Sequence, residues 1–196
     1  MTCRICWDSA KTFATIKVDA ESSALMRCGI ALGSNIEDRL AHLRDGFTRA
    51  CSFHEPGPPV AVSSIYETAP VDCEPGTSHY LNAVIEINFS GPPVALLDRL
   101  REIEQAMGRP SKRPRNSPRT IDLDVLYAGN LVLNNPEIII PHPRLHQRRF
   151  VLAPLAEIAP DLVLPGYLRP IKLLLAELRD STEVTSLHRS QFLKDL

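Results

Sequence analysis

The clearest pattern of hydrophobic and polar positions lies in segment 80–89, where apolar residues recur at every second position. Successive side chains of a strand point to opposite faces, so this spacing predicts a strand with two distinct faces. One face is expected to hold Leu81, Ala83, Ile85, Ile87 and Phe89, and the other Tyr80, Asn82, Val84, Glu86 and Asn88. Short runs rich in apolar residues predict further strands at 27–32, 60–66 and 120–127.

Helices are predicted where apolar residues recur at spacings of three and four, the period of one helix face. Such stripes cover about 36–47, 94–107 and 171–178. Ser34 and Glu37 have the spacing of a capping box, which predicts the start of the first helix there. Gly108 predicts the end of the second helix, and we expect a loop followed by a short helix over 144–157.

The order of these elements is strand, helix, strand, strand, helix, strand. This order is typical of the split βαβ arrangement, so we expect an α+β fold with a ferredoxin-like βαββαβ core and an antiparallel sheet. Gly129 and Asn130 predict a hairpin turn into 131–133, and the last helix decorates the core. We expect an N-terminal extension over 1–25, a main domain over 26–165 and a C-terminal helical tail over 166–196.

Composition places the chain among soluble globular proteins, with 44% hydrophobic and 23% charged residues among 196. Lys and Arg number 22 against 23 Asp and Glu, a net charge of −1 that argues against a nucleic-acid partner. No apolar run reaches the length of a membrane span, and charged residues interrupt the first twenty positions. The five cysteines form no disulfide framework, and we interpret the Cys3–Cys6 pair as accidental. We expect a cytoplasmic monomer.

Asp122 and Asp124 are the most informative polar residues, because they lie two positions apart in the predicted strand 120–127. Both carboxylates therefore project from one face, with Cα atoms roughly 6.5 Å apart, while Ile121, Leu123 and Val125 point into the core. Two such carboxylates can hold Mg²⁺, which completes its octahedron with water and substrate phosphate. The alternative is that both are solvated on an exposed strand face.

Cationic residues surround this pair of aspartates in the sequence. They are Arg109, Lys112, Arg113, Arg115 and Arg119 before it, and Arg144, Arg148 and Arg149 after it. Because Arg and Lys bind phosphate oxygens, the pattern favours a polyphosphate site with two metal ions. The chain has no G-x-x-x-x-G-K-[ST] loop, which excludes a P-loop enzyme. A two-metal nuclease or nucleotidyltransferase stays open, and so does an RNA-binding module, although only 6% of residues are aromatic.

Several motifs together resemble one family of enzymes. They are Gly33-Ser34-Asn35, Ser63-Ser64-Ile65-Tyr66, Tyr80-Leu81-Asn82-Ala83, Pro118 to Leu126, Pro141-His142 and Arg148 to Pro160. In this order they resemble the 6-hydroxymethyl-7,8-dihydropterin pyrophosphokinases of folate biosynthesis, and the resemblance covers about 26–165. It implies transfer of the β,γ-pyrophosphoryl group of ATP to the hydroxymethyl oxygen of the pterin, which leaves AMP.

The resemblance also implies roles for individual residues. Asp122 and Asp124 would hold two Mg²⁺ ions and act in catalysis with Arg109 and Arg119. The ATP site would include Glu104, Lys112, Val125, His142 and Arg148, and the pterin site would include Thr68, Val71, Tyr80, Asn82 and Phe150. Without the resemblance, these residues leave a purely structural alternative open, in which Tyr80 and Phe150 are core aromatics and Asn82 caps a strand edge.

Two departures from the family pattern affect a predicted loop. Asn116-Ser117 replaces the usual Trp-Gly before Pro118, and Ser111 replaces a common Arg. We expect ATP with two Mg²⁺ ions to bind first and the pterin to follow, after which loops 68–78 and 109–118 close and exclude water. The departures are therefore expected to change loop closure more than the type of reaction.

Overall fold

The computed structural model describes residues 25–56, 61–70, 76, 78–109, 118–180 and 182–187. Within this part of the chain, the main sheet consists of β1 (Leu25–Ser34), β2 (Ala61–Val62), β3 (Ile65–Thr68), β4 (Tyr80–Ser90), β5 (Asp122–Ala128) and β8 (Val184–Leu187). The strand order is β5-β1-β4-β3-β8, β2 pairs with β4, and all pairings are antiparallel. The expected mixture of helices with an antiparallel sheet is confirmed.

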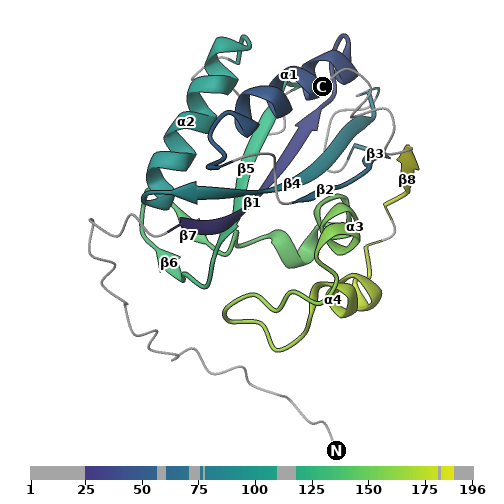
Figure 1. Ribbon diagram of the computed structural model, residues 1–196. Coiled ribbons are helices and arrows are strands. Elements are labelled where there is room, and N and C mark those ends of the chain that lie inside the picture. The colour runs from purple at the N-terminus through teal and green to yellow at the C-terminus, as the bar shows by residue number, and fades with distance from the viewer. Residues whose placement is uncertain are drawn as a thin grey trace, which may run out of the picture.

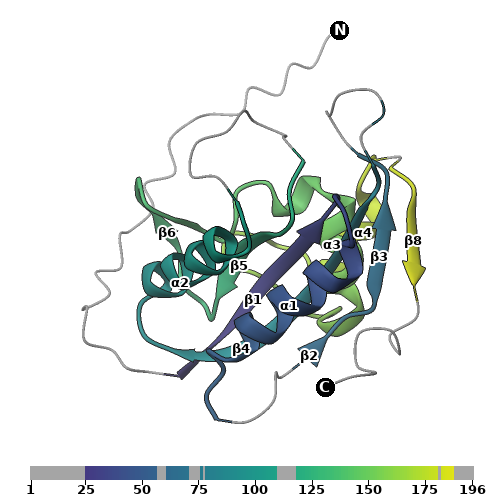
Figure 2. The ribbon, with the colours of Figure 1, turned by 90° about the horizontal axis from the view of Figure 1, so that it is seen from above.

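Helices cover both faces of this sheet (Figures 1 and 2). On one face lie α1 (Arg39–Cys51) and α2 (Pro93–Ala106), and on the other lie the 3₁₀ helix η1 (Leu145–Gln147), α3 (Arg149–Ile158) and α4 (Ile171–Glu177). Phe47 of α1 and Leu100 of α2 are buried in the first core, and Leu152 of α3 is buried in the second. The bounds of α2 and α4 confirm the helices predicted over 94–107 and 171–178.

The alternation predicted for segment 80–89 is also confirmed. The odd-numbered apolar residues, Leu81 to Phe89, belong to the core beneath α1 and α2, whereas Val84 belongs to the core beneath α3. Because β4 lies between β1 and β3 and both of its faces are covered, Asn82 and Glu86 are buried as well.

The capping box predicted for α1 is wrong. Ser34 is the last residue of β1, and its buried hydroxyl has no hydrogen-bond partner. Glu37 has a φ of 53°, which is not helical. The helix begins at Arg39, and the Asp38 carboxylate caps it by accepting a hydrogen bond from the Ala41 N–H at 3.0 Å.

Two strand predictions need correction. The strand expected over 60–66 is divided, because Ser63 and Ser64 separate β2 from β3. Gly129 does not begin a hairpin with β5, because β6 (Leu133–Asn134) pairs instead with β7 (Ile139–Ile140). The turn of that hairpin is closed by Asn135, whose side-chain oxygen accepts hydrogen bonds from the N–H groups of Glu137 and Ile138.

The C-terminal region contains more than the expected helix. After α4, strand β8 pairs with β3 at the edge of the sheet, which the sequence pattern did not predict. Of the expected N-terminal extension, only Leu25 is described, and it begins β1. The Cys3–Cys6 pair lies outside the described residues. Among the described residues, no helix combines the length and the apolar character of a membrane span.

Candidate active site

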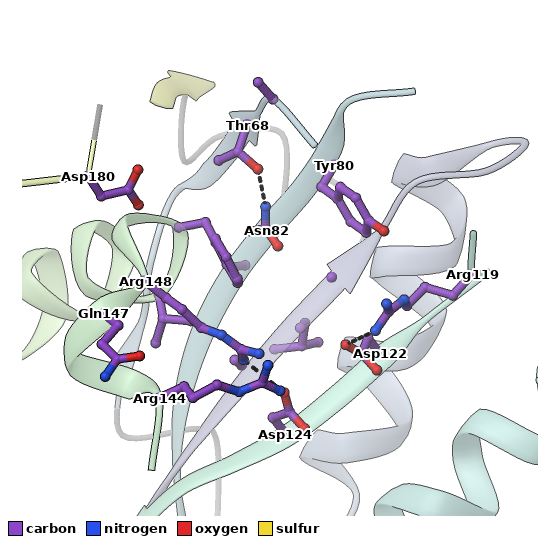
Figure 3. Close-up of a pocket in the computed structure, with 17 residues that line it drawn as sticks. Thr68, Tyr80, Asn82, Arg119, Asp122, Asp124, Arg144, Gln147, Arg148 and Asp180 are labelled. Carbon is purple, nitrogen blue, oxygen red and sulfur yellow. Dashed lines mark hydrogen bonds and ion pairs between the residues drawn. The ribbon is translucent and has the colours of Figure 1, made fainter. Parts of the chain in front are cut away.

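A pocket of about 460 Å³ lies where β1, β3, β4, β5 and the start of α3 meet (Figure 3). In this view Asp122, Asp124, Arg144 and Arg148 gather in the lower part, while Thr68, Tyr80 and Asn82 lie above them. The pocket is large enough for small-molecule substrates. One part of its wall is therefore strongly charged, and another offers hydroxyl, amide and aromatic groups.

The two aspartates project from β5 as the alternation predicted. Ile121, Leu123 and Val125 are buried in the core, and Asp122 and Asp124 line the pocket. The pKa of Asp124 is raised, first by burial and second by the charge of Asp122, although three arginines act in the opposite direction. A cation between the two carboxylates would relieve this repulsion.

Guanidinium groups balance part of the charge of Asp122. Arg109 lies 2.8 Å from one carboxylate oxygen, and Arg119 forms an ion pair with the other. Arg109 also pairs with the buried carboxylate of Glu104, which accepts a hydrogen bond from the Leu123 N–H at 2.8 Å. Glu104 thus joins α2 to β5 and holds Arg109 beside Asp122.

Arg148 lies beside Asp124, with 3.7 Å between its guanidinium nitrogen and the carboxylate oxygen. Burial and the nearby charge of Arg144 lower the pKa of Arg148. Burial, and after it the charges of Arg148 and Arg144, lower the pKa of His142 to about 4. His142 is therefore neutral at neutral pH, and two guanidinium groups face the pocket close enough to repel each other. Such a pair favours a bound anion.

The uncharged part of the wall contains the residues expected for the pterin. The amide nitrogen of Asn82 donates to the Thr68 hydroxyl at 2.7 Å, which leaves the amide oxygen for another donor. Asn82 lies on the central strand β4, so the strand-edge alternative is wrong. Tyr80 and Phe150 are only partly buried and line the pocket, which argues against a purely core role.

Cationic side chains contact both of these aromatic rings. The guanidinium carbon of Arg119 lies 5.9 Å from the centre of the Tyr80 ring, and that of Arg148 lies 5.4 Å from the centre of the Phe150 ring. These distances are typical of cation–π contacts. They join the charged part of the pocket to its aromatic part.

Some predicted site residues lie elsewhere. Within the described part of the chain, Glu104, Arg109, Val125 and His142 are not among the residues that line the pocket, and Val125 is only 5% exposed in the core. A direct side-chain contact between Val125 and a nucleotide is therefore not supported. Val71 and Lys112 lie outside the described residues, and so do most of loops 68–78 and 109–118, whose closure stays a prediction.

The sequence reasoning gave no role to Gly33 and Asn35, although both belong to the Gly-Ser-Asn motif. A Cβ atom at position 33 would lie 3.0 Å from the amide oxygen of Asn82, so Gly33 leaves room for that side chain. Asn35 holds the backbone of Arg119 through two hydrogen bonds, one from the Arg119 N–H to its side-chain oxygen at 2.8 Å and one from its own N–H to the Arg119 carbonyl at 3.2 Å. The motif thereby positions a residue 84 positions later.

The residues of the pocket fit a magnesium ion that is bound together with a phosphate substrate. Among the described residues, no group of three or more His, Cys, Asp or Glu side chains could hold a metal ion. Mg²⁺ is commonly bound by one or two carboxylates with substrate phosphates and water as the remaining ligands. Asp122 and Asp124 supply such a pair. A cation bound between them would offset the charge of Asp122, which is one cause of the raised pKa of Asp124.

Comparisons with known proteins show which family the chain belongs to. A sequence model of the family described as 7,8-dihydro-6-hydroxymethylpterin-pyrophosphokinase (HPPK) matches residues 29–160. The Bacillus subtilis protein named 2-amino-4-hydroxy-6-hydroxymethyldihydropteridine pyrophosphokinase is 44% identical over 129 residues, which cover 66% of this chain and 75% of that protein. The Haemophilus influenzae protein of the same name is 41% identical over 137 residues, which cover 70% and 84% of the two chains.

The fold is also similar to that of solved structures. The crystal structure of wild-type Plasmodium falciparum HPPK-DHPS aligns with a TM-score of 0.62 at 14% identity, over 80% of this chain and 45% of that chain. At this identity the likeness concerns the fold alone. The family match and the two bacterial relatives carry the assignment, and the chain therefore belongs to the 7,8-dihydro-6-hydroxymethylpterin-pyrophosphokinase family and is a pyrophosphokinase of folate synthesis.

Proposed function

We propose that this pyrophosphokinase transfers the β,γ-pyrophosphoryl group of ATP to the hydroxymethyl oxygen of 6-hydroxymethyl-7,8-dihydropterin, leaving AMP, and that the pocket in Figure 3 binds both substrates. The observation that carries the proposal is that a pair of carboxylates with arginines and a Thr–Asn–aromatic group share one pocket. The first set matches the chemistry of a triphosphate, and the second matches the chemistry of a flat heteroaromatic ring.

The charged part of the pocket is assigned to the triphosphate. Asp122 and Asp124 would hold two Mg²⁺ ions, which supply charge neutralisation at the phosphates and lower the pKa of a bound hydroxyl. Arg119 and Arg148 bind phosphate oxygens by charge-assisted hydrogen bonds and stabilise the negative charge that develops during transfer. Arg109 keeps the Asp122 carboxylate in place, and the neutral His142 leaves the positive charge to the arginines.

The uncharged part is assigned to the pterin. The amide of Asn82 is fixed by its hydrogen bond to Thr68, so its free oxygen can accept a hydrogen bond from the pterin edge. Phe150 and Tyr80 offer ring faces for stacking. Binding both substrates in one pocket places the hydroxymethyl oxygen beside the phosphate chain, and this positioning accounts for a large share of the rate acceleration.

Three further predictions concern the whole molecule: its topology, its partners and its location and oligomeric state. The strand order β5-β1-β4-β3, with α1 and α2 on one face, supports a ferredoxin-like core. The net charge of −1 supports a protein without a nucleic-acid partner. A cytoplasmic monomer stays our prediction, and sedimentation of the purified protein would test the monomer.

The proposal is tested by Asn82→Ala, with Asn88→Ala as the matched control on the same strand and the same predicted face, away from the pocket. AMP formation is measured with ATP, Mg²⁺ and 6-hydroxymethyl-7,8-dihydropterin, and calorimetry gives the dissociation constant of each substrate. We expect Asn82→Ala to weaken pterin binding roughly tenfold or more and to spare ATP, because a buried hydrogen-bond partner is lost. Weaker ATP binding with unchanged pterin binding would contradict the placement.

A further inference from the structure

Part of the pocket wall comes from a segment that follows the residues matched by the family. Asp180 lines the pocket beside the start of α3 (Figure 3), whereas the family match ends at residue 160. We call Leu178, Asp180 and Thr182 the C-terminal clasp, because all three lie between α4 and β8 and take part in the hydrogen bonds described next.

The clasp holds both the backbone and the side chain of Arg149. The Asp180 carboxylate accepts a hydrogen bond from the Arg149 N–H at 3.2 Å, and the Asp180 carbonyl accepts one from Arg149 Nε at 2.8 Å. The Leu178 carbonyl accepts a third from Arg149 Nη2 at 3.4 Å. Arg149, which the sequence pattern grouped with the phosphate-binding cations, therefore binds another part of its own chain.

This contact supplies a cap that α3 lacks. The N-cap residue of α3 is Arg148, and its side chain makes no capping hydrogen bond. The first N–H groups of a helix need acceptors, and a negative charge near them is favourable. Although burial tends to raise the pKa of Asp180, its hydrogen bonds with Thr182 and Arg149 lower it overall, so the carboxylate is charged at neutral pH.

The clasp also reaches the other wall of the pocket. The second carboxylate oxygen of Asp180 accepts a hydrogen bond from the Thr182 N–H at 2.8 Å and another from the Thr182 hydroxyl. Two residues later β8 begins, and Val184 pairs with Thr68 of β3. One short segment thus connects the start of α3 to the strand that carries Thr68.

We infer that Asp180 is a positioning residue for pyrophosphoryl transfer: it fixes Arg149 and thereby sets the orientation of the neighbouring Arg148 and Phe150 toward the two substrates. The inference rests on the proposed roles of Arg148 at the phosphates and Phe150 at the pterin. The contact between the Arg148 guanidinium and the Phe150 ring couples these two side chains, so a shift at the start of α3 moves both. Because small displacements of reacting groups reduce rates strongly, such a shift affects binding and turnover together.

The test uses full-length Asp180→Ala and Asp180→Asn, with Asp161→Ala as the control. Asp161 is an exposed aspartate that pairs with Lys172 in the same region, so its replacement changes the net charge equally. Calorimetry gives the dissociation constant of the pterin in the presence of Mg²⁺ and a nonhydrolysable ATP analogue, and steady-state assays give kcat. We expect Asp180→Ala to weaken pterin binding roughly tenfold and to lower kcat, and Asp180→Asn to recover part of both because its amide oxygen still accepts from Arg149.

Phe150→Ala and the double variant with Asp180→Ala complete the design. If Phe150→Ala leaves pterin binding unchanged, the proposed pterin site fails. If Phe150→Ala weakens binding but Asp180→Ala matches Asp161→Ala, the clasp has only a structural role and the inference is overturned. Effects of Phe150→Ala and Asp180→Ala that do not add support it, since coupled residues act non-additively. Should Asp180→Ala fail to fold, Asp180→Asn takes its place in the same comparison, because it removes the charge that the Arg149 N–H faces and keeps the side chain in size.

Discussion

Asp122 and Asp124 lie two residues apart on β5, yet their surroundings differ. Asp122 is held by ion pairs with Arg109 and Arg119, whereas Asp124 has a raised pKa and its nearest described cation, Arg148, lies 3.7 Å away. A carboxylate whose pKa is raised on folding destabilises the folded protein at pH values where it is ionised. At neutral pH, Asp124 therefore opposes folding of the ligand-free protein, and Asp122 supports it.

We accordingly predict that Asp124→Asn and Asp122→Asn both lower kcat by about 100-fold or more but shift stability in opposite directions. Asp124→Asn should raise the melting temperature of the ligand-free protein, because it removes a repelled charge. Asp122→Asn should lower the free energy of unfolding by about 1–2 kcal/mol, because Arg109 and Arg119 each lose one ion pair. Calorimetric melting at pH 7 measures both shifts, and a destabilised Asp124→Asn protein would contradict the first.

His142 is expected to make the stability of the folded protein depend on pH, and the sign of this dependence follows from its low pKa. Burial and the charges of Arg148 and Arg144 lower this pKa to about 4, while the unfolded value is about 6.5. Between these values the unfolded chain binds a proton that the folded protein does not, so stability falls as the pH falls from about 6.5 to 4. NMR titration of the imidazole should give the low pKa directly, and His142→Gln should flatten this part of the stability curve. An imidazole pKa near 6.5 would contradict a buried His142 beside two guanidinium groups.

At the scale of elements, two residues near the start of α1 differ in whether they cap the helix. Asp38 accepts the capping hydrogen bond, whereas the Ser34 hydroxyl is buried without a partner. Asp38→Ala should therefore cost about 1 kcal/mol of stability. Ser34→Ala should leave stability unchanged or raise it slightly, because an unsatisfied buried hydroxyl is removed. Urea denaturation of the two variants measures their free energies of unfolding. A larger loss of stability for Ser34→Ala than for Asp38→Ala would contradict this assignment of the cap.

The elements that the sequence predicted well are those whose pattern is local. The alternation along β4 and the Asp-x-Asp pair of β5 each follow from side chains pointing to opposite faces of one strand. The capping box failed because β1 continues through Ser34, so the hydroxyl that would cap a helix is still part of the sheet. β8 has four residues of mixed polarity, and only its pairing with β3 makes it a strand.

At the scale of the whole molecule, the site depends on contacts between residues far apart in the chain, which no spacing rule can reveal. Asn35 holds Arg119, and Asp180 holds Arg149, across 84 and 31 positions respectively. The resemblance named eight of the 17 residues that line the pocket, because it carries such contacts implicitly. It assigned both Glu104 and Val125 to the ATP site, although both are buried and neither lines the pocket. The alternation along the strand had already pointed Val125 into the core, whereas no pattern indicated the direction of Glu104.

The same long-range construction predicts how ligands stabilise the protein. The pocket joins β1, β3, β4, β5 and α3, so a ligand that binds it opposes global unfolding. A ligand at 100 times its dissociation constant adds about 2.7 kcal/mol, and for a chain of this size about 2–4 °C accompany each kcal/mol. Two carboxylates alone are an incomplete magnesium site, so we expect Mg²⁺ alone, or a nonhydrolysable ATP analogue with EDTA, to shift the melting temperature little. The two together should raise it by roughly 5–11 °C, and Asp124→Asn should abolish most of that rise. A full shift with Mg²⁺ alone would instead indicate a metal site that is complete without the nucleotide.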